Sequence, residues 1–337
     1  MVQSFLILMF ILLLNLILFK NNQFIAEKLN LFDKPDSRRK LHLEQIALNG
    51  GIFFFFNIFL IFLCDYLFNN LHVSLFFEFK NEFKIVYFIL TCLFLLLLGI
   101  IDDKISLRPL TKTSLSIILF ASFLIMNKNF YIMELKFETI NKVIDLFNLS
   151  FIFTVVCFAV LQITLNMYDG INLQSSFYYI TLAIFFLLIS ENFGLKLFCF
   201  FIIFYLFFFS FYNFKGKIFL GDNGVYLFSF IYSLILINIY NTTKFLYVEN
   251  ILILVLFPFL DLMRLFLLRL KNNNNPFEGD RNHIQHILIK KFGLIKSNLI
   301  LIFPLIISMI LFHSMNIDLL IILFFKIIIY LFLIKQK

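Results

Sequence analysis

The chain has 337 residues, of which 62% are hydrophobic, only 14% are charged and 53 are phenylalanine. A soluble domain is excluded, because its polar side chains would not cover so much apolar surface. A disordered chain is excluded as well, because disorder requires low hydrophobicity. The class that remains is an all-α, polytopic membrane protein built as a helical bundle. The formal charge of +8 fits loops that face anionic lipid headgroups.

Eleven apolar runs are long enough, or nearly so, to cross a bilayer as helices. The run 113–126 is the shortest, and an interfacial helix is the alternative interpretation for it. The first run has no charged leader and no small-residue cleavage site, so we expect it to remain as a span. The predicted spans are 4–19, 47–66, 85–101, 113–126, 146–166, 174–190, 197–212, 224–240, 249–269, 299–313 and 317–334.

Basic residues orient these spans, because Lys and Arg concentrate in cytoplasmic loops. With the N-terminus outside, twenty of the 28 basic residues lie on the inner side and seven on the outer side. We therefore predict an N-out, C-in topology. The whole chain, 1–337, is expected to form one integral membrane domain with five cytoplasmic loops. These loops are 20–46, 102–112, 167–173, 213–223 and 270–298.

Acidic residues stand at the inner ends of three predicted spans, which places them at one membrane–water interface. A single Asp at such a position usually just ends a helix in solvent, but three sites at one depth favour a shared function. Carboxylates bind Mg²⁺ together with substrate phosphates, so Mg²⁺ is the expected ion and Mn²⁺ the alternative. The acids are Asp102 and Asp103 after run 85–101, Asp169 after run 146–166 and Asp222 before run 224–240.

Asp102 and Asp103 are expected to play different roles, because neighbouring residues of a helix point about 100° apart. One carboxylate would lie near the metal ion and the other near the proton or the nucleophile. The two longest inner loops carry Arg, Lys and His clusters, which suit a diphosphate substrate. Anchoring by the positive-inside rule is the alternative explanation for any basic loop.

Five motifs, in this order, resemble those of the polyprenyl-phosphate N-acetylhexosamine-1-phosphate transferases, glycosyltransferase family 4. The resemblance covers roughly residues 33–288. The family's P-x-x-R-K-x-H and G-G match Pro35, Arg38, Arg39, His42, Gly50 and Gly51, and its G-x-x-D-D matches Gly99 to Asp103, followed by Lys112. Its N-M-x-D-G matches Asn166 to Gly170, and its F-x-G-D-x-G matches Phe219 to Gly224. Its D-x-x-R and P-F-x-x-D-R-x-H-x-H-H match Asp261, Arg264, Pro276, Phe277, Asp280, Arg281, His283 and His286.

Three positions depart from the family's pattern. Gln285 replaces the middle His of H-x-H-H, which bears on phosphate affinity or on the pH profile. Asn172 stands where many relatives have a second Asp, and Asn49 where an Arg is more usual.

The resemblance implies a helical bundle with its active site at the cytoplasmic face of the bacterial inner membrane. It implies transfer of a sugar 1-phosphate from a UDP-sugar, such as UDP-GlcNAc, to undecaprenyl phosphate, with release of UMP. This reaction starts the synthesis of a cell-envelope polysaccharide such as O-antigen. The branch that uses UDP-MurNAc-pentapeptide ranks lower, because the chain lacks a consecutive His triplet. A non-catalytic relative and a lipid-sugar transporter remain as alternatives, and the transporter is disfavoured because transport sites usually lie near the midplane.

The resemblance also assigns roles and partners. UDP-sugar, undecaprenyl phosphate and membrane lipid are the expected partners, nucleic acid is not, and an apolar exterior permits a homodimer. The expected metal ligands are Asp222, Asp169 and Asp102. The expected catalytic residues are Asp102, Asp103, Asp169 and His283. The expected substrate-binding residues are Arg38, Arg39, His42, Lys112, Asn166, Arg264, Asp280, Arg281 and His286.

Overall fold

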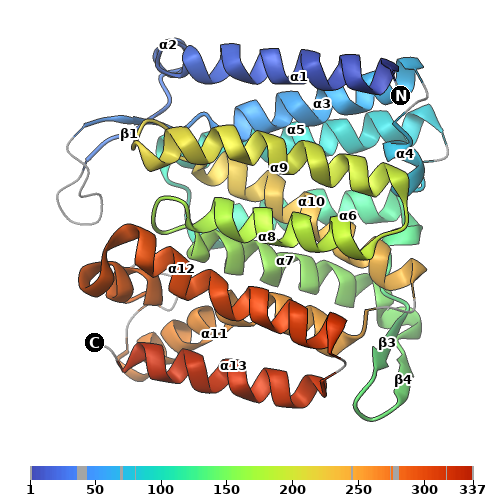
Figure 1. The fold of residues 1–337 in the computed structure, drawn as a ribbon, viewed down its shortest axis with the longest axis vertical. Coiled ribbons are helices and arrows are strands. Elements are labelled where there is room, and N and C mark those ends of the chain that lie inside the picture. Colours follow the sequence, from blue (N-terminus) through green and yellow to red (C-terminus); the bar gives the residue numbers. More distant parts are fainter. Residues whose placement is uncertain are drawn as a thin grey trace. The chain divides into compact units, whose positions relative to one another are not determined.

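The computed structural model describes residues 2–35, 44–68, 71–79, 81–243, 246–273, 275, 281–315 and 317–335 (Figure 1). Helix accounts for 79% of the residues, which confirms the predicted all-α class. The chain divides into two compact units. The first unit is Met1–Asn129 with Tyr179–Ile235, and the second is Phe130–Tyr178 with Leu236–Lys337. Helices α8 (Gln174–Ile189) and α10 (Gly221–Thr242) pass from one unit to the other.

Seven helices and a two-stranded sheet make up most of the first unit. Helix α1 packs beside α3 and α9, α3 packs beside α5, and α5 packs beside α6. The elements are α1 (Val2–Lys20), α2 (Asn22–Leu29), β1 (Phe32–Asp33), β2 (Ile46–Ala47), α3 (Gly50–Phe68), α4 (Val73–Phe76), α5 (Glu82–Ile105), α6 (Pro109–Met126) and α9 (Phe193–Phe214).

Aromatic rings fill much of the interior of the first unit. Phe54 of α3 stacks on Phe228 of α10 with ring centroids 3.8 Å apart. A buried amide pair also joins α1 to α3, because Asn15 and Asn57 each donate to the other's Oδ1 at 2.8 and 3.0 Å. Hydrogen bonds of this kind between spanning helices typically contribute about 0.6 kcal/mol each.

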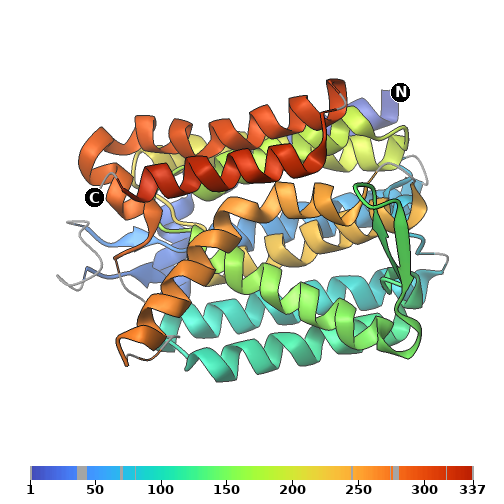
Figure 2. The ribbon, with the colours of Figure 1, turned by 90° about the horizontal axis from the view of Figure 1, so that it is seen from below.

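The second unit combines four helices with a β-hairpin that the sequence analysis did not predict. Its strands pair Glu134 with Asp145 in antiparallel register (Figure 2). Lys136 N of β3 donates to Tyr240 Oη of α10 at 2.7 Å, and this bond links the hairpin to the helix. The elements are β3 (Glu134–Phe137), β4 (Lys142–Asp145), α7 (Ser150–Tyr168), α11 (Val248–Lys271), α12 (Ile284–Ser314) and α13 (Leu319–Ile334), with short 3₁₀ turns at Lys128–Phe130 and Phe147–Leu149.

A proline inside α11 explains one buried polar contact, and a second contact lies beside it. Pro258 has no N–H to donate to the carbonyl of Leu254, four residues earlier. Tyr178 Oη donates to that carbonyl at 3.2 Å, and Lys326 Nζ of α13 donates to the neighbouring carbonyl of Ile253 at 2.5 Å. Lys326, a basic residue inside the last predicted span, therefore links α13 to α11 near the proline.

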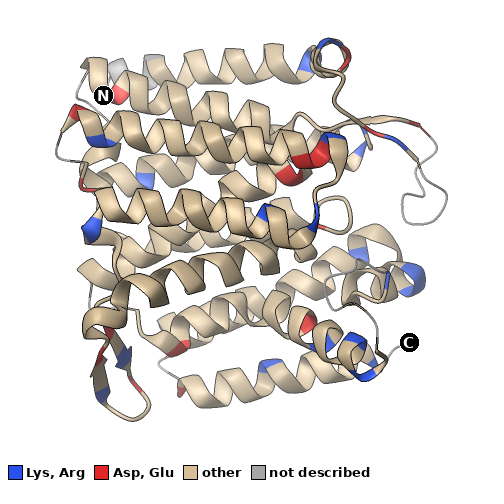
Figure 3. Cartoon of the chain, turned by 180° about the vertical axis from the view of Figure 1, so that it is seen from behind, with Lys and Arg blue, Asp and Glu red and all other residues tan. Residues whose placement is uncertain are grey.

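Within the described residues, eight helices are long and apolar enough to cross a membrane, or nine if the bent pair α1–α2 is one span. The helices α8 and α13 are shorter and apolar, and they coincide with the predicted spans 174–190 and 317–334. Most charged residues lie near helix ends and in the connecting segments (Figure 3). The helical membrane bundle is confirmed, whereas the count of eleven spans and the N-out orientation stay predictions.

The helices extend further than the predicted spans and continue into three of the predicted cytoplasmic loops. Helix α5 continues through Asp102 and Asp103 to Ile105, which leaves only 106–108 between α5 and α6. The predicted loop 270–298 contains the start of α12, and the predicted loop 20–46 contains α2, β1 and the first residue of β2. The apolar runs end at the first charged residues, whereas the helical hydrogen bonds of the backbone continue through those residues.

Gly99 of α5 sets how closely this helix approaches the start of α10. A Cβ at this position would overlap backbone atoms of Asn223. We expect Gly99→Ala to lower the free energy of unfolding by about 1–3 kcal/mol, because overpacking forces the helices apart. Thermal unfolding in detergent measures this, with Ile101→Ala, at an exposed position of the same helix, as the control. A Gly99→Ala protein as stable as the wild type would contradict the close contact.

Candidate active site

Asp102 lies in the last turn of α5, and its buried carboxylate accepts hydrogen bonds from the connection to α6, from α6 and from α10. Its Oδ1 accepts from Leu107 N at 2.8 Å. Its Oδ2 accepts from Lys112 Nζ of α6 and from Tyr226 Oη of α10, each at 2.8 Å. The carboxylate is therefore paired with a cation and joins α5, α6 and α10 at one end.

Asp103 caps the N-terminus of α10. Its Oδ1 accepts from Asp222 N at 2.9 Å, and its Oδ2 accepts from Asn223 N at 3.2 Å and from Asn223 Nδ2 at 2.5 Å. The first N–H groups of a helix have no acceptor within the helix, and the positive end of the helix dipole favours an anion there. Asp103 thus fixes the backbone that carries Asp222.

The segment that leads into α3 supports the same helix start from the other side. Phe219 N donates to Ala47 O at 2.8 Å, and Gly51 N donates to Leu220 O at 3.2 Å. Asn223 Nδ2 also donates to Leu48 O at 2.9 Å. Backbone atoms of the predicted G-G motif therefore position the turn before Asp222.

Lys112 lies between two of the acids. Its Nζ is 2.8 Å from Asp102 Oδ2 and 3.8 Å from Asp222 Oδ2. The side chain of Asp222 is 28% exposed, against 2% for Asp102. Asp222 is therefore the more accessible carboxylate of the two, and it lies beside a cation that suits phosphate.

Asp169 belongs to the second unit, where it follows the last residue of α7. Its backbone N–H donates to Leu165 O at 3.1 Å, so it closes the helix as the C-cap. Burial raises the pKa of the Asp169 carboxyl to about 6, and a hydrogen bond from Ser175 opposes part of this shift. Asn166 lies one turn earlier and is half-buried.

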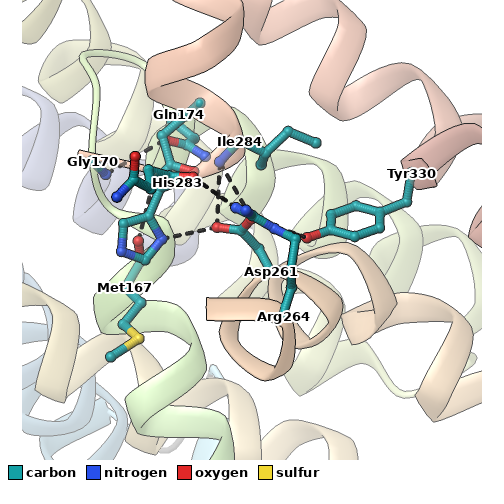
Figure 4. Close-up of polar contacts among 10 residues, drawn as sticks. Met167, Gly170, Gln174, Asp261, Arg264, His283, Ile284 and Tyr330 are labelled. Carbon is teal, nitrogen blue, oxygen red and sulfur yellow. Dashed lines mark hydrogen bonds and ion pairs between the residues drawn. The ribbon is translucent and has the colours of Figure 1, made fainter. Parts of the chain in front are cut away.

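Asp261 organises a second polar cluster, also in the second unit (Figure 4). Its Oδ1 accepts from Arg264 Nη2 at 2.7 Å and from Tyr330 Oη of α13 at 3.0 Å, and its Oδ2 is 2.8 Å from His283 Nδ1. It also accepts from Ile284 N at 3.2 Å, which caps α12. One buried carboxylate thus joins α11, α12 and α13.

The guanidinium of Arg264 donates hydrogen bonds to several acceptors. Its Nη2 also donates to Asn282 O at 2.7 Å, and its Nε donates to Tyr330 Oη at 3.0 Å. His283 is the N-cap of α12, and its ring lies 6.4 Å from that of His286 between centroids. The Asp261 carboxylate fixes the orientation of the His283 ring through Nδ1.

Residues 85–240 match the model of the family described as glycosyl transferase family 4. This segment belongs to glycosyl transferase family 4. The match spans Asp102, Asp103, Lys112, Asp169 and Asp222. No curated protein matches the chain. The match supports a multi-pass membrane enzyme of the polyprenyl-phosphate sugar-phosphate transferase kind, with lipid-linked substrates.

The predicted site residues of the transferase fall into groups. In the first unit, the structure brings Asp102, Asp103, Lys112 and Asp222 together. In the second unit, Asp261, Arg264 and His283 form one cluster, and Asn166 and Asp169 lie at the end of α7. Arg281 and His286 flank His283 in the chain at the start of α12. Arg38, Arg39, His42 and Asp280 lie outside the described residues.

Two tyrosines of the transferase's clusters were missed by the sequence analysis. Tyr226 binds Asp102, and its position four residues after Asp222 on one helix was a usable signal. Tyr330 binds Asp261 and Arg264 from the last helix, far from every motif, and nothing in the sequence indicated it.

The residues of the first unit fit a magnesium ion that is held mainly by substrate. Among the described residues, no group of three or more His, Cys, Asp or Glu side chains has the geometry of a complete metal site. The oxygens of Asp102 are occupied by Lys112, Tyr226 and Leu107. Mg²⁺ is commonly bound by one or two carboxylates with waters and substrate phosphates, and Asp222 fits that role.

The raised pKa of Asp169 predicts a pH-dependent stability. In the folded protein the pKa of this carboxyl is about 6, above the usual value of an Asp, so the carboxyl keeps its proton to a higher pH than in the unfolded chain. The fold therefore loses stability as the pH rises from about 4 through 6, and the full loss persists above that pH. We expect Asp169→Asn to be more thermostable than the wild type at pH 8, with a difference that shrinks toward pH 4. Thermal unfolding in detergent with EDTA measures this, and a less stable Asp169→Asn protein at pH 8 would contradict it.

Proposed function

We propose that the protein transfers N-acetylhexosamine 1-phosphate from a UDP-sugar to undecaprenyl phosphate and releases UMP. The reaction would take place at the cytoplasmic face of a bacterial inner membrane and start the synthesis of a cell-envelope polysaccharide. The observation that carries this proposal is the cluster of Asp102, Lys112 and Asp222, which joins the ends of three apolar helices inside the family match.

The charges of the substrates explain why such a cluster is needed. A UDP-sugar and a lipid phosphate are both anions, and two unit charges 5 Å apart repel by about 3 kcal/mol at an effective dielectric constant of 20. The ammonium of Lys112 offsets part of this repulsion. Asp222 would hold Mg²⁺, which would supply further neutralisation and polarise a phosphoryl oxygen when bound.

The bonding of Asp103 favours direct displacement over an aspartyl-phosphate intermediate. A carboxylate that already accepts three hydrogen bonds is a weak nucleophile, and Asp103 accepts three. In direct displacement, an oxygen of the lipid phosphate attacks the β-phosphorus, the bond from that phosphorus to the bridging oxygen breaks, and UMP leaves. Asp103 then acts by positioning Asp222, and Asp102 acts by orienting Lys112.

The second unit carries phosphate-binding candidates of its own. Arg281, His283 and His286 are cationic or imidazole groups of the kind that would bind a diphosphate and stabilise a leaving UMP. Arg264 already donates to Asp261, Asn282 and Tyr330. We therefore assign it a role in positioning His283 through Asp261 rather than in binding phosphate. Arg38, Arg39, His42 and Asp280 remain candidates for substrate contacts.

Release of UMP tests the proposal directly. Purified protein with undecaprenyl phosphate and Mg²⁺ is expected to release UMP from UDP-GlcNAc, and EDTA is expected to stop the reaction. Asp222→Asn should lower the rate by about 100-fold or more, because it removes the accessible carboxylate. Glu82→Gln, an exposed acid at the other end of α5, serves as the matched control and should keep the wild-type rate.

Other outcomes distinguish the alternatives. Release only from UDP-MurNAc-pentapeptide would move the enzyme to peptidoglycan synthesis. No release from either nucleotide, with nucleotide binding retained, would identify a non-catalytic relative or an enzyme for a different UDP-sugar. A fully active Asp222→Asn protein would refute the assignment of the metal ligand.

A further inference from the structure

Helix α12 is broken near its middle. Gly293 has φ 74° and ψ 175°, a backbone conformation that residues with a Cβ rarely adopt. Among the described residues, apart from its chain neighbours and the backbone of its own helix, no atom lies within 4 Å of where its Cβ would be, so the backbone conformation rather than crowding requires glycine. The break divides α12 into two pieces that lie in different directions, and Ser297 Oγ donates to Gly293 O at 2.6 Å beside it.

Both pieces of α12 bind the end of α7 and the short segment that follows it. From the first piece, Gln285 Nε2 donates to Met167 O at 3.0 Å. From the second piece, Asn298 Nδ2 donates to Asn172 O at 2.9 Å. The two amides are 1% and 2% exposed. Their acceptors lie on either side of Asp169 in the chain.

Gln285 also lies directly against the turn after Asp169. A Cβ at Gly170 would be 2.5 Å from Gln285 Nε2 and 3.2 Å from its Cδ. On this turn, Gly170 N donates to Gln174 Oε1 at 3.4 Å (Figure 4). Within the described part of the chain, Gln285 Oε1 and Asn298 Oδ1 have no hydrogen-bond partner, so both amides act as donors to this segment.

We propose that Gln285 and Asn298 are positioning residues for Asp169 and together form an amide clasp on residues 167–172. In this segment the N–H groups of Asp169 and Gly170 donate to Leu165 O and Tyr168 O, and the two amides bind the carbonyls of Met167 and Asn172 on either side of them. The clasp accounts for the departure from the family's His at 285, because an amide donates the same hydrogen bond at every pH. The catalytic part of this inference rests on the proposed function, whereas the structural part does not.

Hydrogen exchange tests the clasp independently of activity. Gln285→Met and Asn298→Leu keep the approximate volume of the side chain and remove the donor. We expect amide exchange of residues 169–173, followed by mass spectrometry, to become at least tenfold faster in each variant. Asn241→Leu is the matched control, because Asn241 Nδ2 makes the same kind of bond to Tyr131 O, at 2.9 Å, beyond the opposite end of α7. Unchanged exchange in both clasp variants would overturn the proposal.

Kinetics tests the positioning role. We expect Gln285→Met to lower kcat by at least tenfold while the KM for the UDP-sugar stays within twofold, and Gln285→His, which restores an N–H donor, to recover most of kcat. Loss of kcat without faster exchange would mean that Gln285 contacts substrate itself, which overturns the positioning role. Wild-type protein that releases no UMP would refute the proposed function, and the exchange result would still decide the clasp.

Discussion

The hydrogen bonds from the start of α10 to the Asp103 carboxylate determine the geometry of the first unit's site. They join residues 119 and 120 positions apart in the chain. In an apolar environment an unsatisfied N–H is costly, and the first turn of a helix has several such groups. The start of α10 is therefore held at the end of α5, and Asp222 is placed beside Lys112 as a consequence.

In the second unit, too, a carboxylate accepts a hydrogen bond from the start of a helix. Asp261 accepts from Ile284 N at the start of α12 and also binds His283 and Arg264. In both units, an acid from one motif thus accepts hydrogen bonds from the start of a helix that carries residues of another motif. Asp222 is more accessible than Asp102, which is why it is the strongest candidate for a metal ligand.

Polar residues within apolar helices have structural partners at several places in this protein. Asn15 and Asn57 pair with each other, and Lys326 donates to a carbonyl next to a proline. Intramembrane polar residues are often functional, so each is a reasonable functional candidate in the sequence. Their direct bonds to neighbouring helices indicate instead that they fix how those helices pack.

Composition and hydropathy were enough to predict the class of protein, and the order of its motifs could be read directly from the residues. Long apolar runs with charges between them permit little other than a helical membrane bundle, and Asp102, Asp103 and Asp222 stood at helix ends because hydropathy changes there. The packing of the helices was needed to show that Asp102 binds Lys112 while Asp103 caps α10, that Tyr226 and Tyr330 belong to the clusters, and that Gln285 donates to Met167 O. Hydropathy and helical periodicity report where a residue lies along its own helix, whereas its hydrogen-bond partners on other helices are set by how those helices pack.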